Sequence, residues 1–172
     1  MDKRERIYLW IATVMLGIFM MAIIYSTLVL SIRIPSDKGK IIVKPGESLV
    51  QSVFQTPPFD HPGLYKRGEK EYELVIVGQA WAFNPADIEI PLNSTVRIKA
   101  TSLDLQHGFY IASTPVNIML IPGEITVLEY KFKKAGSYRI ICNEYCGMLH
   151  HAMTKCAGLP CRLGRGRIAR TA

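Results

Sequence analysis

The distribution of apolar residues separates a long N-terminal stretch from the rest of the chain. No charged residue occurs between Ile7 and Ile32, a run of 26 residues. As a helix this run would extend about 39 Å, more than the roughly 30 Å of a bilayer's hydrocarbon core. It is apolar on every side, which argues against a core helix of a globular domain. It is also too long for the apolar part of a signal peptide, and no A-x-A-like cleavage site follows it. Residues 1–33 are therefore predicted to be a transmembrane anchor.

The charges beside this predicted helix leave its orientation open. Three basic residues precede it and four follow it closely. The positive-inside rule depends on an imbalance of Lys and Arg between the two sides, so it does not decide here.

Residues 34–70 show no sustained periodicity and hold five of the ten prolines. The segment FQTPPFDHPG cannot continue a helix or a central strand, because proline lacks the backbone N–H. We therefore expect a connector, with one short helix around residues 48–55.

A different pattern begins at Glu71. The run YELVIV has strand length, and TVRIKAT alternates, with Val96, Ile98 and Ala100 on one face. ITVLEYKF alternates too, SYRIIC follows the turn signal KKAG, and PLNS and IPGE mark further turns. No helical pattern of ten residues or more follows the anchor. Short strands separated by such turns predict an all-β sandwich or barrel over residues 71–153.

The net charge of +7 is concentrated at the C-terminus. Residues 154–172 contain five basic residues and no acidic residue, which leaves 16 basic and 14 acidic residues elsewhere. The body of the protein is close to neutral, so we do not expect a nucleic-acid partner. The tail is rich in Gly and Arg, and its structure is uncertain from sequence.

The stretch ICNEYCGMLHHAM carries an unusual density of metal-binding side chains. Two cysteines, two histidines, a methionine and a glutamate fall between Cys142 and Met153. A disulfide between Cys142 and Cys146 would close a very small ring and leave the other side chains unexplained. Zinc takes Cys and His at similar spacings, but it gains nothing from a thioether. Copper in electron transfer uses thiolate, imidazole and a weak axial Met, so copper accounts for every residue type.

Two thiolates in one loop could bridge two copper ions, and each ion would then need a terminal imidazole. The second imidazole must come from outside the loop. His61 lies in the connector, whereas His107 lies in SLDLQHGFYI, just after a predicted strand, where the loops of a sandwich gather. We therefore favour His107.

The pattern C-x-E-x-C-x3-H-x2-M resembles the dinuclear copper (CuA) motif of subunit II of the haem–copper cytochrome c oxidases. SLDLQH is similar to the element of that family that carries the first histidine ligand. The resemblance runs from the anchor through Met153. It implies a cupredoxin-like Greek-key sandwich preceded by one transmembrane helix. A single anchor helix resembles the B-type branch of the family, since the mitochondrial type has two.

The resemblance also implies a ligand set on two copper ions. Cys142 and Cys146 would bridge the ions, and His107 and His150 would each bind one of them.

The two remaining ligands would be weak. Met153 would be the axial ligand of one copper, and the backbone carbonyl of Glu144 would be that of the other. His151 is the rival of His150, but three residues after it comes Thr154 rather than a methionine. The family spacing therefore selects His150.

In GQAWAFNP, Trp81 and Phe83 resemble the aromatic segment near which electrons enter from cytochrome c. The alternative is that both are core aromatics of a strand. The resemblance further implies that electrons pass to the haems of subunit I, which also holds CuB and reduces oxygen to water. The chain would cross the cell inner membrane once, with lipid around its helix and its copper domain in the periplasm.

The family's last strand follows the axial methionine, but here the sequence continues TKCAGLPCRLGRGRIARTA. This segment does not alternate, and a strand over residues 167–171 is only weakly indicated. Cys156 and Cys161 could form a disulfide or stay free. A shifted reading frame after Met153 is one hypothesis for the departure.

Three other functions fit parts of the sequence. A CuA domain for nitrous-oxide reduction would require a large reductase domain. A membrane-anchored metallochaperone would rely on Met and His with few thiolates. A receptor-like β-sandwich would have a disulfide and no metal.

Overall fold

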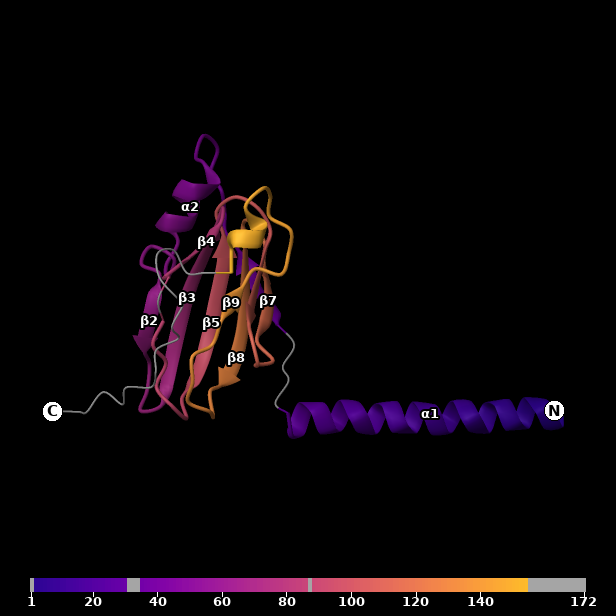
Figure 1. Cartoon of the computed structure of the whole chain (residues 1–172). Helices are drawn as coiled ribbons and strands as arrows, with labels where there is room; N and C mark the ends of the chain where they lie inside the picture. The colour runs from indigo at the N-terminus through magenta and orange to yellow at the C-terminus, as the bar shows by residue number, and fades with distance from the viewer. Residues whose placement is uncertain (1, 31–34, 87, 155–172) are drawn as a thin grey trace. The chain divides into compact units, whose positions relative to one another are not determined.

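A computed structural model describes residues 2–30, 35–86 and 88–154 of the chain. The chain divides into two compact units, residues 1–33 and 34–172. Figure 1 shows a single long helix in the first unit and a β-rich domain in the second.

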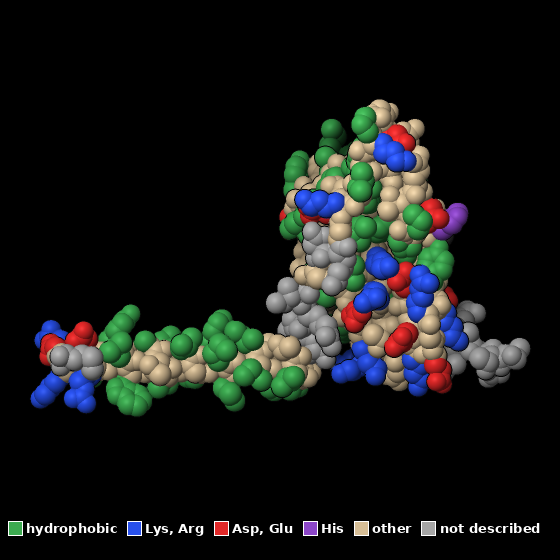
Figure 2. Space-filling model, turned by 180° about the vertical axis from the view of Figure 1, so that it is seen from behind, with side chains coloured by type: hydrophobic (Ala, Val, Ile, Leu, Met, Phe, Trp, Pro, Cys, Tyr) green, Lys and Arg blue, Asp and Glu red, His purple; other side chains and the backbone are tan. Residues whose placement is uncertain are grey.

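The first unit is the helix α1, Lys3–Leu28. A capping box begins it: the side chain of Asp2 caps the first turn, and that of Glu5 accepts a hydrogen bond from the backbone N–H of Asp2. None of its side chains is buried, and hydrophobic side chains line both visible edges of the helix beyond its charged N-terminal end (Figure 2). The predicted single apolar helix is confirmed, and it is long and apolar enough to cross a membrane.

The second unit is a sandwich of two β-sheets. Both sheets contain strands from distant parts of the sequence. The large sheet has the order β1 (Ser36–Lys40), β8 (Glu124–Lys131), β5 (Thr95–Ser102), β3 (Glu71–Gln79) and β2 (Gly63–Lys66), and β4 (Ala82–Asn84) also pairs with β3. The small sheet has the order β7 (Asn117–Leu120), β6 (His107–Ile111) and β9 (Ile140–Ile141).

The main core lies between the two sheets. The predicted alternation of β5 holds, since Val96, Ile98 and Ala100 are fully buried. On the opposite face, Lys99 forms an ion pair with Glu73. The small sheet adds the core residues Phe109, Ile111, Ile118, Leu120 and Ile140. The predicted sandwich is therefore correct, with each sheet supplying one apolar face to a shared interior.

A second, smaller core covers the other face of the large sheet. Strand β3 is buried on both faces, and its residues Val75 and Val77 pack against this smaller core. The covering residues include Val53 on α2 (Leu49–Gln55) and Phe59 just beyond it, both fully buried. Ser48 caps α2 in a capping box with Gln51, which confirms the short helix expected there.

The expectation of a connector over residues 34–70 was wrong in one respect, because this segment supplies both edges of the large sheet. Strand β1 pairs with β8, and β2 pairs with β3. Edge strands bond to a neighbour on one side only, so they tolerate the charges, glycine and nearby prolines that hide their pattern. The segment after Met153 that was to close the sandwich lies outside the described residues, as do Cys156 and Cys161.

The path of the chain between the sheets brings the ligand-bearing segments together. After β5 the chain crosses to β6 and β7, returns to the large sheet as β8, and crosses again to β9. Strands β6 and β9 are neighbours in the small sheet, where Tyr110 pairs with Ile141, although 30 residues lie between the two in the sequence. His107 begins β6 and Cys142 follows β9, so the sheet places both at one end of the sandwich.

Two phenylalanines of the supposed connector give a test of its role. Phe59 is fully buried and Phe54 is 39% exposed. Phe59→Ala is expected to lower the free energy of unfolding by about 3–5 kcal/mol, because it leaves a cavity in the smaller core. Phe54→Ala, the matched control, is expected to cost under about 1 kcal/mol. Denaturation of the full chain in detergent, followed by circular dichroism, measures both, and equal small effects would contradict the packing described.

Candidate metal centre

The two ends of the centre are fixed by adjacent strands. His107 is fully buried at the start of β6, and Cys142 comes directly after β9. Beside them, Gly108 and Asn143 are in close contact: a Cβ on Gly108 would lie 2.0 Å from the Asn143 Oδ1 and 3.0 Å from its backbone nitrogen. The Asn143 side chain also donates a hydrogen bond to Asn117 on β7. Glycine at 108 is what lets the two segments approach so closely.

The loop that follows Cys142 folds back on itself. The backbone N–H of Cys142 donates to the carbonyl of Met153 at 3.1 Å, which closes the loop at its base. Gly147 has a φ of +106°, which glycine adopts without strain. From there the chain forms tight turns that end in the 3-10 helix η1, His150–Ala152. This compact path turns His150 and Met153 back toward the cysteines.

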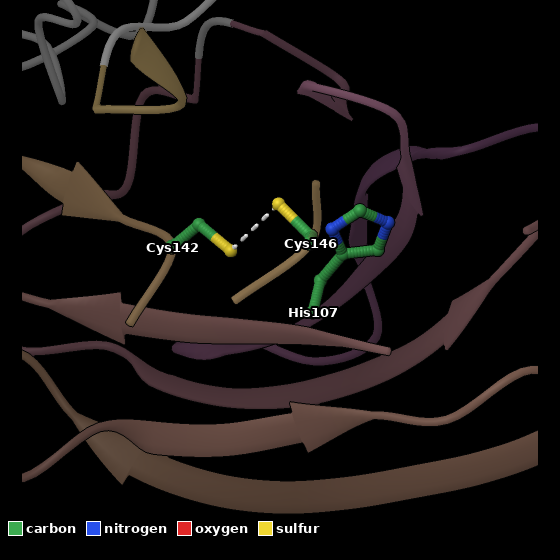
Figure 3. A group of neighbouring side chains, drawn as sticks. All are labelled: His107, Cys142 and Cys146. Atoms are coloured by element: carbon green, nitrogen blue, oxygen red, sulfur yellow. Dashed lines mark hydrogen bonds between the residues drawn. The ribbon is translucent and has the colours of Figure 1, made fainter. Parts of the chain in front are cut away.

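The thiol of Cys146 lies at the middle of the cluster. Its Sγ is 3.6 Å from the Sγ of Cys142, 3.5 Å from the Nδ1 of His150 and 3.5 Å from the Sδ of Met153. The carbonyl oxygen of Glu144 is 3.2 Å from the Cys142 Sγ. Figure 3 shows the two sulfur atoms facing each other and the His107 ring beside Cys146. One donor atom each from His107, Cys142 and Cys146 lies within 4.8 Å of the other two.

The interior of this cluster disfavours charged thiolates unless a cation is present. Cys142, Cys146 and Met153 are all at most 3% exposed. Burial and the neighbouring Cys142 raise the pKa of Cys146 to about 12. A bound metal ion reverses this preference, since it holds the thiolates and releases their protons. The pair of buried thiols is therefore suited to a cation.

The imidazole of His107 is held in one orientation by Asp104. Its Nε2 lies 2.9 Å from the Asp104 Oδ1, whereas its Nδ1 is buried and has no partner among the described residues. Burial opposes ionisation of Asp104, but hydrogen bonds from His107 and from the backbone N–H of Leu105 and Ala80 outweigh it and lower the pKa. A carboxylate on one ring nitrogen leaves the other free as a metal ligand. The unpartnered Nδ1 thus fits a metal.

The geometry argues against two of the three interpretations of the loop, a disulfide and a zinc site, and favours the third, copper. A disulfide requires an S–S distance near 2.05 Å, and Cys142 and Cys146 are free thiols 3.6 Å apart. Zinc would use the thiols and imidazoles but not the buried thioether beside Cys146. A soft thioether among thiolates and imidazoles is typical of copper.

The remaining predicted residues divide between core and surface. Trp81 is 38% exposed, and its Nε1 lies 3.7 Å from where a Cβ on Gly147 would be. Phe83 is 4% exposed and packs edge-on against Phe109, as expected of a core aromatic. His151 is exposed on the outside of the loop.

His61 is not part of this cluster, whereas Asp104, which sequence reasoning missed, contacts it through His107. His61 is exposed and pairs weakly with its neighbour Asp60. Asp104 stands three residues before His107 in SLDLQH, a spacing that could have indicated a carboxylate partner for the imidazole.

Comparisons with known proteins agree on one family. The family model described as cytochrome c oxidase subunit II, periplasmic domain, matches residues 80–158. Two curated proteins named cytochrome c oxidase subunit 2, both from Thermus thermophilus, are 36% identical over 104 residues. That alignment covers 59% of this chain and 77% and 62% of theirs. A chain in a cryo-EM structure of a heme-copper terminal oxidase dimer is 35% identical, with a TM-score of 0.67, over 87% of this chain and 95% of that chain.

The contact between Gly108 and Asn143 predicts that a methyl group at 108 will damage the centre. Gly108→Ala should displace Asn143 and weaken metal binding by about tenfold or more, with a stability loss of about 1–3 kcal/mol. Gly136→Ala is the control, because the nearest atom to a Cβ there is 3.9 Å away. Metal affinity by competition with a chelator, measured for both variants, checks the prediction. Equal affinities would show that the loop does not depend on this contact.

Proposed function

This chain belongs to the family of cytochrome c oxidase subunit II, and from that premise we propose that its metal centre is the dinuclear copper centre CuA, at which electrons enter the oxidase. As a subunit of a haem–copper terminal oxidase, the protein is part of an oxidoreductase complex. In the proposal it accepts electrons from cytochrome c and passes them to the haems of subunit I, where oxygen is reduced to water. The haems and CuB belong to subunit I.

One observation carries the proposal: of the six groups predicted as ligands, two are buried thiols that lie 3.6 Å apart, and the other four gather around them. The Sγ of Cys146 lies at the centre of this group. It is 3.5–3.6 Å from the thiol of Cys142, the imidazole of His150 and the thioether of Met153. Two thiols so placed can share two ions, whereas a mononuclear blue-copper site uses one cysteine.

The chain's own residues would hold the copper ions in a fixed geometry. Cys142 and Cys146 would bridge the ions, and His107 and His150 would each bind one. Met153 and the carbonyl of Glu144 would be the weak axial ligands. Two copper ions that share one unpaired electron spread the change in charge over many bonds, so transfer needs little reorganisation. The sandwich keeps the ligands in place, and Asp104 fixes the His107 ring.

The helix α1 would anchor the domain as a single span in the inner membrane, surrounded by lipid. The name of the matching family model, a periplasmic domain, supports a position of the copper domain in the periplasm. The near-neutral body of the protein gives no reason to expect a nucleic-acid partner.

Trp81 is the better candidate of the two aromatic residues for receiving electrons. It is exposed, adjoins Gly147 of the ligand loop, and has a φ of +91°, which is strained for a residue other than glycine. Backbone strain concentrates at functional sites. Phe83 is in the core, so its part would be to support this segment from beneath.

Metal analysis and EPR of the oxidised chain test the copper proposal. Two copper ions per chain that share one spin, seen as a seven-line hyperfine pattern, are expected. Four lines from one copper would contradict the dinuclear centre, and a chain without bound copper would contradict the copper proposal altogether.

Single substitutions assign the ligands. Cys146→Ser should abolish the dinuclear spectrum, because it removes a bridging thiolate. His151→Ala should leave the spectrum unchanged, because that side chain points to solvent. Loss of the signal in His151→Ala would show that the choice of His150 is wrong.

Removal of the Trp81 indole should slow the reduction of the centre by cytochrome c. We expect Trp81→Phe to lower the rate constant roughly tenfold, equal to about 1.4 kcal/mol in the barrier, with an unaltered EPR spectrum. The matched control is Trp10→Phe in the anchor helix. Stopped-flow kinetics on the assembled oxidase make the comparison, and equal rates in the two variants would remove Trp81 from the path.

A further inference from the structure

The loop that carries His150 and Met153 has a second methionine and a second histidine at the same spacing. Backbone hydrogen bonds run from His150 to Gly147, from Ala152 to Leu149 and from Met153 to His150, each spanning three residues. In such 3-10 geometry, side chains three residues apart lie on the same side. His150 and Met153 form the inner pair, which faces Cys146. Met148 and His151 form the outer pair.

The outer pair has no part in the fold. Met148 is 83% exposed, and His151 is also exposed. In the part of the chain that the structure describes, neither side chain forms a hydrogen bond, an ion pair or a ring contact. A thioether and an imidazole are both ligands for copper, and the thioether favours Cu(I).

The inner ligands are largely shielded from solvent. His107, Cys142, Cys146 and Met153 are 0–3% exposed, so an ion cannot reach them directly from solvent. Among the predicted side-chain ligands, His150 alone is partly exposed. The outer pair stands on either side of His150 in the sequence, and the Cα atoms of His150 and His151 are about 3.8 Å apart. An incoming ion therefore meets the outer pair at the accessible edge of the centre.

We propose that Met148 and His151 form a transient binding site for Cu(I), from which copper is transferred past His150 to the buried thiols. This proposal rests on the proposed function, because it presumes a copper centre inside the loop. In this proposal, Met148 and His151 deliver copper to the centre, although neither is one of its ligands.

The transfer is an exchange of ligands and moves no electron. The bonds from copper to the Met148 sulfur and the His151 nitrogen break, and bonds to the His150 nitrogen and a cysteine sulfur form. The cysteine thiol releases its proton to solvent as it becomes a thiolate. The direction follows from the donors, since two neutral, exposed ligands hold copper less strongly than buried thiolates do.

The exposed apolar residues of the loop suggest a different use for Met148. Tyr145 is 80% exposed and Leu149 is 42% exposed, so Met148 could belong to an apolar contact surface for a protein partner. The two roles differ in what they require of the side chain. A contact surface needs apolar area, which leucine also supplies, whereas copper needs the sulfur atom.

The rate of copper uptake separates the two roles. The reduced full-length chain in detergent, with Cys156→Ser and Cys161→Ser in every variant, receives Cu(I) from its bicinchoninate complex, whose colour reports the transfer. Met148→Leu and His151→Gln together should slow uptake by about tenfold. The final copper content and the EPR spectrum after oxidation should equal those of the unaltered chain. Met21→Leu with His61→Gln is the matched control, since it removes another exposed methionine, on α1, and an exposed histidine, both outside the ligand loop. Unchanged uptake in Met148→Leu with His151→Gln would overturn the proposal.

A second experiment tests the outer pair without the dinuclear centre. In a chain with all four cysteines (142, 146, 156 and 161) replaced by serine and with Met153→Leu, one Cu(I) should still bind weakly, with sulfur and nitrogen neighbours in the X-ray absorption spectrum. Adding Met148→Leu should remove the sulfur signal and most of the binding. If the sulfur signal persists after Met148→Leu, or if the chain without the four cysteines and Met153 binds no Cu(I), the outer pair is not a copper site. Failure of the proposed function is recognised separately, by the absence of the seven-line spectrum in the unaltered chain.

Discussion

The pairing of β6 with β9 is the contact on which the metal centre depends. It consists of two residue pairs, Tyr110 with Ile141 and Ile111 with Ile140, yet it sets His107 and Cys142 at the same end of the small sheet. The short pairing is stable because the strands pack on the shared core, in which Phe109 and Ile111 are fully buried. The positions of His107 and Cys142 are thus fixed by apolar packing outside the cluster, as a site that must not change shape requires.

Hydrophobic pattern and ligand spacing predicted what depends on local sequence. The anchor follows from length and the absence of charge, β5 from its alternation, and the ligand loop from the residue types between Cys142 and Met153. The edge strands β1 and β2 were missed because their stability comes from backbone pairing with β8 and β3, which leaves little pattern in the side chains. The convergence of β6 and β9 could not be read from spacing, since it arises from two crossings between sheets.

The electrostatics of the site favour a metal on both sides of the cluster. On one side, Asp104 occupies the Nε2 of His107 and leaves Nδ1 buried without a partner. On the other, burial keeps the thiol of Cys146 protonated, with a pKa of about 12. Each arrangement is costly without a cation and is relieved when one binds. The fold therefore places the side chains in position, but the Nδ1 of His107 and the thiol of Cys146 would gain a favourable partner only when a cation binds.

This preparation raises the question of how copper reaches a buried centre. Dense packing excludes solvent from His107, Cys142, Cys146 and Met153, and the same packing excludes the ion. In the proposed centre, copper would pass by the accessible edge at His150. A turn in which side chains repeat every three residues gives the chain an inner and an outer face from one short segment. Methionine and histidine on the inner face would hold copper in place, and the same two residue types on the outer face are exposed enough to exchange it. Burial, rather than residue type, would then determine which pair retains the metal and which pair delivers it.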